Sequence, residues 1–328
     1  MQVRITHPER VFWPDDGFSK RDLLEYYAAA APYLLKHLRD RPLTLKRYPN
    51  GIFGKHFYQK HVEIELPDFV EREALFAEQH QSAGDHVLCN NVETLLWLGQ
   101  MGNLELHPWY SRVTGVPDAR RLPRTFSRSI EDLEQSVLNY PDFMVFDLDP
   151  YVYSGEEPLG HEPALNPDGY VRTCQAAWWL KEVLDQLRLS SFVKTSGKTG
   201  LHVFVPILRH YDYDMVRGMS EQICRYVLNL HPRELTMEWA VIRRRGKVFL
   251  DHNQNTRGKT LASVYSPRAL PGAPVSMPLR WDELDRVFPS DFTIANALER
   301  IEQVGDLWEN ILDAKTDLAM AWGATRAA

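Results

Sequence analysis

Apolar residues recur every three to four positions in several stretches of the chain, which predicts amphipathic helices. The first predicted helix runs through residues 21–38, with Ser19 as its N-cap and a kink at Pro32. A second is expected to begin after Asp85. Its apolar face would contain Val87, Leu88, Val92, Leu95 and Leu96. A third is expected over residues 169–189, and the tail from Trp281 onward also has a helical pattern.

Short runs rich in β-branched and aromatic residues predict strands between these helices. They cover residues 143–149, 190–194, 201–207 and 246–251. Three prolines and a glycine within residues 270–280 predict an extended loop. Strands interleaved with helices indicate an α/β or α+β protein. Because no Pro-, Gly- or Ser-rich linker divides the sequence, we expect residues 1–328 to form a single catalytic domain with two lobes.

The composition excludes several classes of protein. With 44% hydrophobic and 25% charged residues, the 328-residue chain is neither disordered, nor a coiled coil, nor collagen-like. No apolar run approaches the roughly 18 residues that span a bilayer. The N-terminus has no apolar signal core, so we expect a cytoplasmic, non-membrane protein. Three distant cysteines, without a CxxC pair, argue against a disulfide framework and a structural zinc site.

The net charge of −6 conceals two basic segments. Residues 36–61 contain seven Lys or Arg against Asp40, and residues 243–268 contain seven against Asp251. From residue 281 to the end, ten acidic residues face four basic ones. Two basic blocks on an acidic chain can form a local phosphate-binding surface, although two solvated faces would have the same composition.

Paired carboxylates end one predicted strand. Asp147 and Asp149 are two residues apart and therefore share a face of the strand, which Pro150 ends. Two neighbouring carboxylates repel each other unless a cation or a proton lies between them. Mg²⁺ or Mn²⁺ would relieve that repulsion. A solvated loop, or the DxD motif of a glycosyltransferase, would show the same pattern.

A glycine-containing turn joins two predicted strands at residues 196–200. Its backbone N–H groups could converge on an anion, with Ser196, Lys198 and Thr199 adding hydroxyl groups and charge. His202 begins the following strand and could reach the same phosphate. The spacing of a Walker loop is absent. An ordinary hairpin turn is the alternative.

A third acidic residue, Asp251, ends the predicted strand at 246–251 and could complete a two-metal carboxylate cluster. Basic and amide side chains surround it in the sequence: Arg244, Lys247, Gln254, Arg257 and Lys259. Such groups suit a ligand with several negative charges, such as a nucleoside triphosphate. A basic surface hairpin is the alternative. Together, the three features indicate metal-dependent phosphoryl chemistry.

Four motifs in this order, FDLDP, TSGKTGLH, VFLDHNQNTRGKT and YSPRALPGAPVSMPLRWDEL, closely resemble the polymerase domain of bacterial ATP-dependent DNA ligase D. That domain belongs to the archaeo-eukaryotic primase superfamily. The resemblance extends from ITHPERVFWP to WDEL and beyond. It implies a primase-polymerase core, in which an RRM-like antiparallel sheet packs with a smaller α/β lobe. It also implies (ribo)nucleotide addition to a primer 3′-OH at DNA breaks or short gaps in non-homologous end joining.

The resemblance also implies roles for individual residues. The ligands of two Mn²⁺ or Mg²⁺ ions, and thus the catalytic residues, would be Asp147, Asp149 and Asp251. The incoming nucleotide would contact His107, near its sugar, and Ser196, Lys198, Thr199, Gly200, His202, Arg244, Gln254 and Arg268. DNA would contact Arg10, Lys20, Arg47, Phe57 and Tyr58, with Phe57 and Tyr58 stacking near the template base. Arg10 and Lys20 would form a pocket for a 5′-phosphate.

The sequence departs from the family pattern in two places. Many relatives have a lysine directly before the second glycine of the turn, where this chain has Lys198-Thr199. Phe57-Tyr58 replaces a pair of phenylalanines. A KxDG-type nucleotidyl-lysine motif is absent, so we expect no ligase or phosphoesterase domain, and the polymerase would act with an end-joining ligase and an end-binding protein near the nucleoid. A de novo primase, a metal-dependent nuclease and a non-catalytic DNA end-bridging module are the alternatives.

Overall fold

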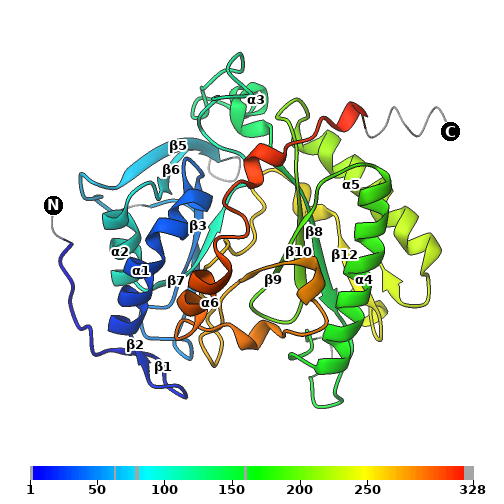
Figure 1. The fold of residues 1–328 in the computed structure, drawn as a ribbon. Coiled ribbons are helices and arrows are strands. Elements are labelled where there is room, and N and C mark those ends of the chain that lie inside the picture. The colour runs from blue at the N-terminus through cyan, green and yellow to red at the C-terminus, as the bar shows by residue number, and fades with distance from the viewer. Residues whose placement is uncertain (1–2, 63, 78–80, 159–160, 321–328) are drawn as a thin grey trace. The chain divides into compact units, whose positions relative to one another are not determined.

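The structure, a computed structural model, describes residues 3–62, 64–77, 81–158 and 161–320 (Figure 1). The chain forms two compact units, and each is built from three separate stretches. Unit 1 comprises Met1–Pro141, Thr260–Ser276 and Phe292–Glu309. Unit 2 comprises Asp142–Lys259, Met277–Asp291 and Asn310–Ala328. Both mix helices with strands, which confirms the predicted α/β class.

Unit 1 contains three small antiparallel sheets. A three-stranded sheet has the order β4 (Phe57–Gln59), β3 (Leu43–Arg47) and β7 (Asn103–Pro108), and the two hairpins are β1 (Val11–Trp13) with β2 (Phe18–Ser19) and β5 (Glu71–Ala77) with β6 (Ser82–Leu88). Its helices are α1 (Lys20–Leu38), α2 (Val92–Gln100), α3 (Ile130–Gln135), η1 (Val137–Asn139) and α6 (Ala297–Val304). Helices α1 and α2 pack together, and α2 contacts β7 (Figure 1).

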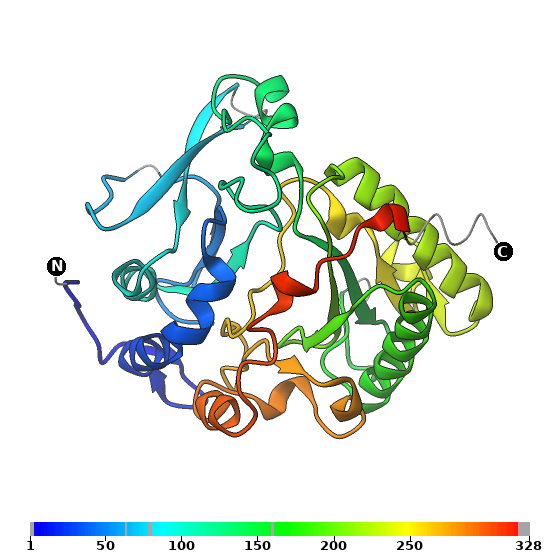
Figure 2. The same cartoon turned by 45° about the horizontal axis from the view of Figure 1, so that its top comes forward.

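Unit 2 is organised by a six-stranded sheet. The strand order is β11 (Leu235–Thr236), β12 (Val248–Asp251), β8 (Phe143–Pro150), β10 (Leu201–Pro206), β9 (Phe192–Thr195) and β13 (Pro278–Leu279). All neighbouring strands are antiparallel except β11 and β12. Helices α4 (Pro167–Gln186) and α5 (Tyr213–Leu230) pack on each other and on β8, and Figure 2 shows them along one side of the sheet. Short helical turns complete the unit: η2 (Val241–Arg243), η3 (Asn253–Asn255), η4 (Trp281–Glu283), η5 (Pro289–Asp291) and η6 (Ile311–Ala314).

Two of the three long helices among the described residues, α1 and α4, follow the predicted patterns closely. Helix α1 begins after Ser19, whose backbone N–H donates to the Asp22 carboxylate over 2.6 Å. The helix continues through Pro32 to Leu38. All four predicted strands are present as β8, β9, β10 and β12. The apolar periodicity therefore located α1, α4 and the central strands of unit 2, whereas α5 was not predicted.

The second predicted helix begins at the wrong place. Residues 82–88 form strand β6, which pairs along its length with β5, and the helix starts only at Val92. Asn91 is the N-cap, because its side chain accepts a hydrogen bond from the backbone N–H of Thr94 over 2.7 Å. Asp85 instead forms an ion pair with Arg72 of the neighbouring strand. The helical spacing of Val87 and Leu88 with later residues was accidental.

Two further predictions hold only in part. The segment 270–280 is mostly turn and loop, but its end forms β13. The tail after residue 281 contains α6 and short helical turns in place of continuous helix, and residues 321–328 lie outside the described part of the chain. Across the residues that the structure describes, no helix has the length and apolar character needed to cross a membrane.

Candidate functional site

A row of polar side chains crosses the unit 2 sheet. Strand register places Lys194 of β9 opposite His202 of β10, His202 opposite Asp147 of β8, and Asp147 opposite Asp251 of β12. Residues directly opposite each other in antiparallel strands share a face of the sheet. Lys194 Nζ lies 2.8 Å from His202 Nδ1, and His202 Nε2 lies 3.3 Å from Asp147 Oδ1. The sheet therefore brings together two predicted carboxylates and one predicted phosphate ligand.

Gln254 joins the two carboxylates of this row. Its Nε2 donates to Asp147 Oδ2 over 3.3 Å and to Asp251 Oδ2 over 3.2 Å. Asp149 lies two residues beyond Asp147 on β8. Burial, reinforced by the charge of the Glu162 carboxylate, raises the pKa of Asp149 to about 6. Burial also raises the pKa of Asp251. These acids lie in a region with too little positive charge to keep them ionised easily.

The chemistry of this donor set fits divalent cations. Three acidic side chains offer hard oxygen ligands, and a cation would offset the burial that raises the pKa values of Asp149 and Asp251. The side chains are not arranged as a finished cage: within the described ranges, no group of three His, Cys, Asp or Glu is positioned to hold a metal ion. The Gln254 amide lies on the two facing oxygens of Asp147 and Asp251. Binding of a cation between these oxygens would therefore displace that amide.

The predicted phosphate-binding turn has a defined internal structure. Ser196 Oγ accepts hydrogen bonds from the backbone N–H groups of Lys198 and Gly200, both over 3.1 Å. Two turn amides thus converge on one oxygen, as they would on an anion. Gly197, with φ of +70°, provides the left-handed residue of the turn. Thr199 is buried, whereas Lys198 is partly exposed and forms a 2.7 Å ion pair with Glu162.

Arg244 is held by contacts within unit 2. Its guanidinium carbon lies 3.5 Å from the ring centroid of Phe249. Its nitrogens donate to the carbonyl oxygens of Glu238 and Trp239 and to the hydroxyl of Tyr151. Arg244 is buried, yet its positive charge acts on Asp149 and Asp251, where it favours the ionised carboxylates. In this structure it supplies electrostatic support, and direct contact with a nucleotide stays a prediction.

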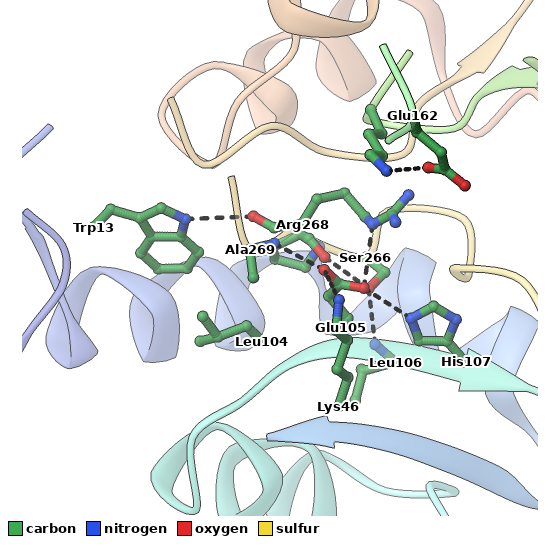
Figure 3. Close-up of polar contacts among 12 residues, drawn as sticks. Trp13, Lys46, Leu104, Glu105, Leu106, His107, Glu162, Ser266, Arg268 and Ala269 are labelled. Atoms are coloured by element: carbon green, nitrogen blue, oxygen red, sulfur yellow. Dashed lines mark hydrogen bonds and ion pairs between the residues drawn. The ribbon is translucent and has the colours of Figure 1, made fainter. Parts of the chain in front are cut away.

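Unit 1 holds the remaining predicted nucleotide residues around Glu105 (Figure 3). Glu105 Oε2 lies 3.0 Å from His107 Nε2 and 3.4 Å from Arg268 Nε. Oε1 accepts from the backbone N–H of Ala269 over 3.0 Å and lies 3.6 Å from Lys46 Nζ. Burial favours the neutral acid, but Arg268, His107 and Lys46 together hold the pKa of Glu105 well below its ordinary value.

The predicted DNA-contacting aromatics lie on the edge strand β4. Phe57 and Tyr58 are exposed, at 45% and 62%. Each has its own cationic partner on β3: Arg47 lies over Phe57, and Lys46 lies over Tyr58. Adjacent residues of a strand point to opposite faces, so the two rings do not form one continuous platform. Tyr58 on β4 and Glu105 on β7 both lie opposite Lys46 of β3. The side chains of Tyr58 and Glu105 are therefore on the same face of the sheet.

Arg10 and Lys20 are close together. The backbone N–H of Lys20 donates to the carbonyl oxygen of Arg10, and burial, followed by the charge of Arg10, lowers the pKa of Lys20. Lys20 Nζ donates to the carbonyl oxygen of Thr6 over 2.8 Å and is buried, whereas Arg10 is exposed. Two neighbouring positive charges suit a phosphate. Arg10 is the accessible member of the pair.

Two residues of these clusters escaped the sequence reasoning. Lys194 and Glu105 are both buried charges inside strands. Charged residues are almost never fully buried without a partner, so Lys194, within the strand predicted at 190–194, carried an available signal. Glu105 carried none, because it lies in β7, which was not predicted. Their partners come from neighbouring strands, which only the register identifies.

Comparison with known protein families shows which family the chain belongs to. The family model described as "LigD, primase-polymerase domain" matches residues 19–308. The chain belongs to this family. A LigD primase-polymerase domain is a nucleotidyltransferase, and the predicted family and primase-polymerase fold are confirmed.

The relatives agree with this assignment. The chain is 30% identical to a "Multifunctional non-homologous end joining protein LigD" from Pseudomonas aeruginosa over 97% of its own length. It is 28% identical to a "Bifunctional non-homologous end joining protein LigD" from Bacillus subtilis over 93% of its length. It spans only 34% and 43%, respectively, of these relatives.

A solved structure supports the same relationship. The chain is similar to the "Polymerase Domain from Mycobacterium tuberculosis Ligase D in complex with DNA", with a TM-score of 0.79 and 25% identity. The similarity covers 96% of this chain and 99% of that one. The comparisons therefore support the predicted polymerase role.

Proposed function

We propose that this LigD primase-polymerase chain adds nucleotides, with ribonucleotides favoured, to a primer 3′-OH at gaps and broken ends of DNA bearing a 5′-phosphate. The observation that carries the proposal is the row of His202, Asp147 and Asp251 across three strands, with Gln254 between the two carboxylates. Family membership supplies the reaction class. The relatives are named for non-homologous end joining, which supports that setting.

Asp147, Asp149 and Asp251 would hold two Mg²⁺ or Mn²⁺ ions in this proposal. When bound, such ions lower the pKa of the primer 3′-OH and neutralise charge on the departing pyrophosphate. The primer oxygen attacks the α-phosphate, the bond to pyrophosphate breaks, and the hydroxyl proton passes to solvent. The charge of Arg244 favours ionised Asp149 and Asp251, which the ligand role needs.

The turn and the adjacent strand would hold the triphosphate. Lys194 and Asp147 orient the His202 ring from opposite sides, and the amides of the turn already converge on an oxygen at Ser196. Lys198 adds a partly exposed ammonium group. In phosphoryl transfer, such positioning and charge neutralisation provide most of the catalysis.

Unit 1 would contact the sugar and the DNA. His107 and Arg268 are proposed for the nucleotide, Tyr58 and Phe57 for stacked bases, and Arg10 with Lys20 for the 5′-phosphate. Base stacking on an aromatic ring contributes about 1–3 kcal/mol per base. An end-joining ligase, an end-binding protein and a cytoplasmic, nucleoid-associated location stay predictions.

A gap-filling assay tests the proposal. The protein is given gapped DNA with a 5′-phosphate, Mn²⁺ and one NTP, and we expect one-nucleotide additions that a chelator abolishes and Mn²⁺ restores. Asp149→Ala should abolish addition, while Asp185→Ala, which removes an exposed carboxylate of the same unit, should not. Product shortening would indicate a nuclease instead. Products made without a 3′-OH would indicate a primase, and end binding without NTP consumption would indicate a bridging module.

The 5′-phosphate pocket needs a separate variant. Arg10→Ala removes an exposed side chain, so the fold should persist. We expect weaker binding only to DNA ends that carry the phosphate. Equal losses on phosphorylated and unphosphorylated ends would show that Arg10 contributes only general electrostatic attraction.

A further inference from the structure

The side chain of Glu105 is 3% exposed and is held on both of its oxygens (Figure 3). Oε1 receives the backbone N–H of Ala269, and Oε2 faces His107 Nε2. Lys46 and Arg268 add two positive charges, at 3.6 Å and 3.4 Å. A carboxylate surrounded in this way stays ionised and can only accept hydrogen bonds.

This arrangement decides where the proton of His107 lies. Since Glu105 only accepts, the shared proton belongs to Nε2 of the imidazole. Burial lowers the pKa of His107, although the Glu105 carboxylate opposes this shift. The lowered pKa favours the neutral ring. Nδ1 therefore carries a lone pair. Among the described residues, His107 makes its hydrogen bond through Nε2 alone, so Nδ1 remains an acceptor for a ligand.

We propose that Glu105 is a positioning residue that fixes the His107 ring with Nδ1 as acceptor for the 2′-hydroxyl of the incoming ribonucleotide. The inference rests on the proposed function, because it deepens the sugar contact assigned to His107. A deoxyribonucleotide would leave the Nδ1 lone pair without its donor. Sites that hydrogen-bond a hydroxyl discriminate against analogues that lack it.

Glu105→Gln changes the hydrogen-bonding pattern with little change in shape. The Ala269 N–H is an obligatory donor, so the oxygen of the introduced amide faces it and the amide nitrogen faces His107. His107 Nε2 must then accept, and its proton moves to Nδ1. The variant ring presents a donor to the sugar in place of an acceptor.

Kinetics with three nucleotides measure this reversal. The wild-type protein should prefer an NTP over both the 2′-deoxy and the 2′-fluoro analogue, because neither analogue has a 2′ donor. In Glu105→Gln, the preference in kcat/KM for the NTP over the 2′-fluoro analogue should fall about three- to tenfold, the effect expected of one hydrogen bond. An equal loss for all three nucleotides would overturn the proposal and leave Glu105 a purely structural role.

The same unit offers a matched control. His37 Nε2 lies 3.2 Å from Asp306 Oδ2, and both side chains are buried. Asp306→Asn makes the same chemical change in a second histidine–carboxylate pair. It should leave the sugar preference unchanged. A preference that falls equally in both variants would overturn the specific role of Glu105.

Nitrogen NMR of the histidine rings gives a readout that needs no activity. Wild-type full-length protein should show His107 protonated at Nε2, and Glu105→Gln should show protonation at Nδ1. A wild-type ring protonated at Nδ1 overturns the inference even if the protein polymerises NTPs. An Nε2-protonated ring in a protein that does not extend primers would instead overturn the proposed function and leave the Glu105–His107 arrangement intact.

Discussion

Gly200, the residue before β10, gives a direct test of how closely the turn at 196–200 approaches strand β8. A Cβ atom at residue 200 would lie 2.1 Å from the carbonyl oxygen of Leu148 and 3.1 Å from Asp149 Oδ1, whereas ordinary van der Waals contact begins at 3.4 Å. The first obstacle is backbone and cannot rotate away. Gly200→Ala should therefore force the strands apart and lower the free energy of unfolding by about 1–3 kcal/mol.

Urea unfolding, followed by tryptophan fluorescence, measures the effect. With a slope of about 1–3 kcal/mol/M, the loss should lower the midpoint by roughly 0.3–3 M. Gly218→Ala is the matched control, since Gly218 lies within α5 and a Cβ there would meet nothing within 4 Å. That variant should gain up to about 1 kcal/mol from helix propensity. Primer extension by Gly200→Ala should also fall by more than the loss of folded protein explains, because the added methyl group contacts Asp149.

A midpoint for Gly200→Ala at or above that of the wild type would refute the reasoning. Normal primer extension by a destabilised Gly200→Ala would show that the turn can shift without disturbing Asp149.

Two other changes test charges in specific settings. Lys315→Met removes the 2.6 Å pair with the fully buried Asp142 and should cost up to about 3 kcal/mol, whereas Lys36→Met, which removes an exposed pair, should cost at most about 1 kcal/mol. Equal urea midpoints for the two variants would contradict the expectation that a buried ion pair contributes more to stability than an exposed one. Glu162→Gln removes the ion-pair partner of Lys198, whose ammonium group would then be available to a phosphate. The KM for an NTP should fall, but by no more than about fivefold, because a partly exposed ion pair is weak. A higher KM in steady-state kinetics would mean that Glu162 helps the nucleotide to bind.

Two long periodic segments were predictable because their pattern repeats often enough to exclude alternatives, although the similarly long α5 at Tyr213–Leu230 was missed. The helix predicted over residues 21–38 is α1 at Lys20–Leu38, and the one predicted over 169–189 is α4 at Pro167–Gln186. The central strands of unit 2 are buried and contain β-branched and aromatic residues, which made them recognisable. Their order, β12-β8-β10-β9, depends on contacts between distant segments and could not be derived from local pattern.

The strands of unit 1 were not predicted, for an equally physical reason. Strand β4 is short and largely exposed, and β5 contains a single buried residue, so neither has a clear apolar face. Strand β6 ends in three buried residues, and buried residues recur in α2 from Thr94, so the apolar positions of the two elements together imitate one helix. Pairing with β5 outweighs that local preference.

In the candidate site, too, some residues could be predicted from the sequence and others could not. Motifs identified Asp147, Asp149 and Asp251 as strand-end acids, and the register then placed Asp147 opposite Asp251. Lys194 and Glu105 were missed because a buried charge has no periodic signature. Its meaning comes from its partners across the sheet, and these belong to other strands.

The division of each unit into three stretches affects how the protein can be made and cut. Unit 1 is incomplete until Phe292–Glu309 has left the ribosome, so its segments must wait while most of unit 2 is synthesised. Contacts between such distant segments slow folding. A gene fragment that stops at Pro141 would also lack Arg268, one of the cations beside Glu105. Isolating either unit for biochemistry would require its three stretches to be joined by new linkers or to be co-expressed as separate fragments.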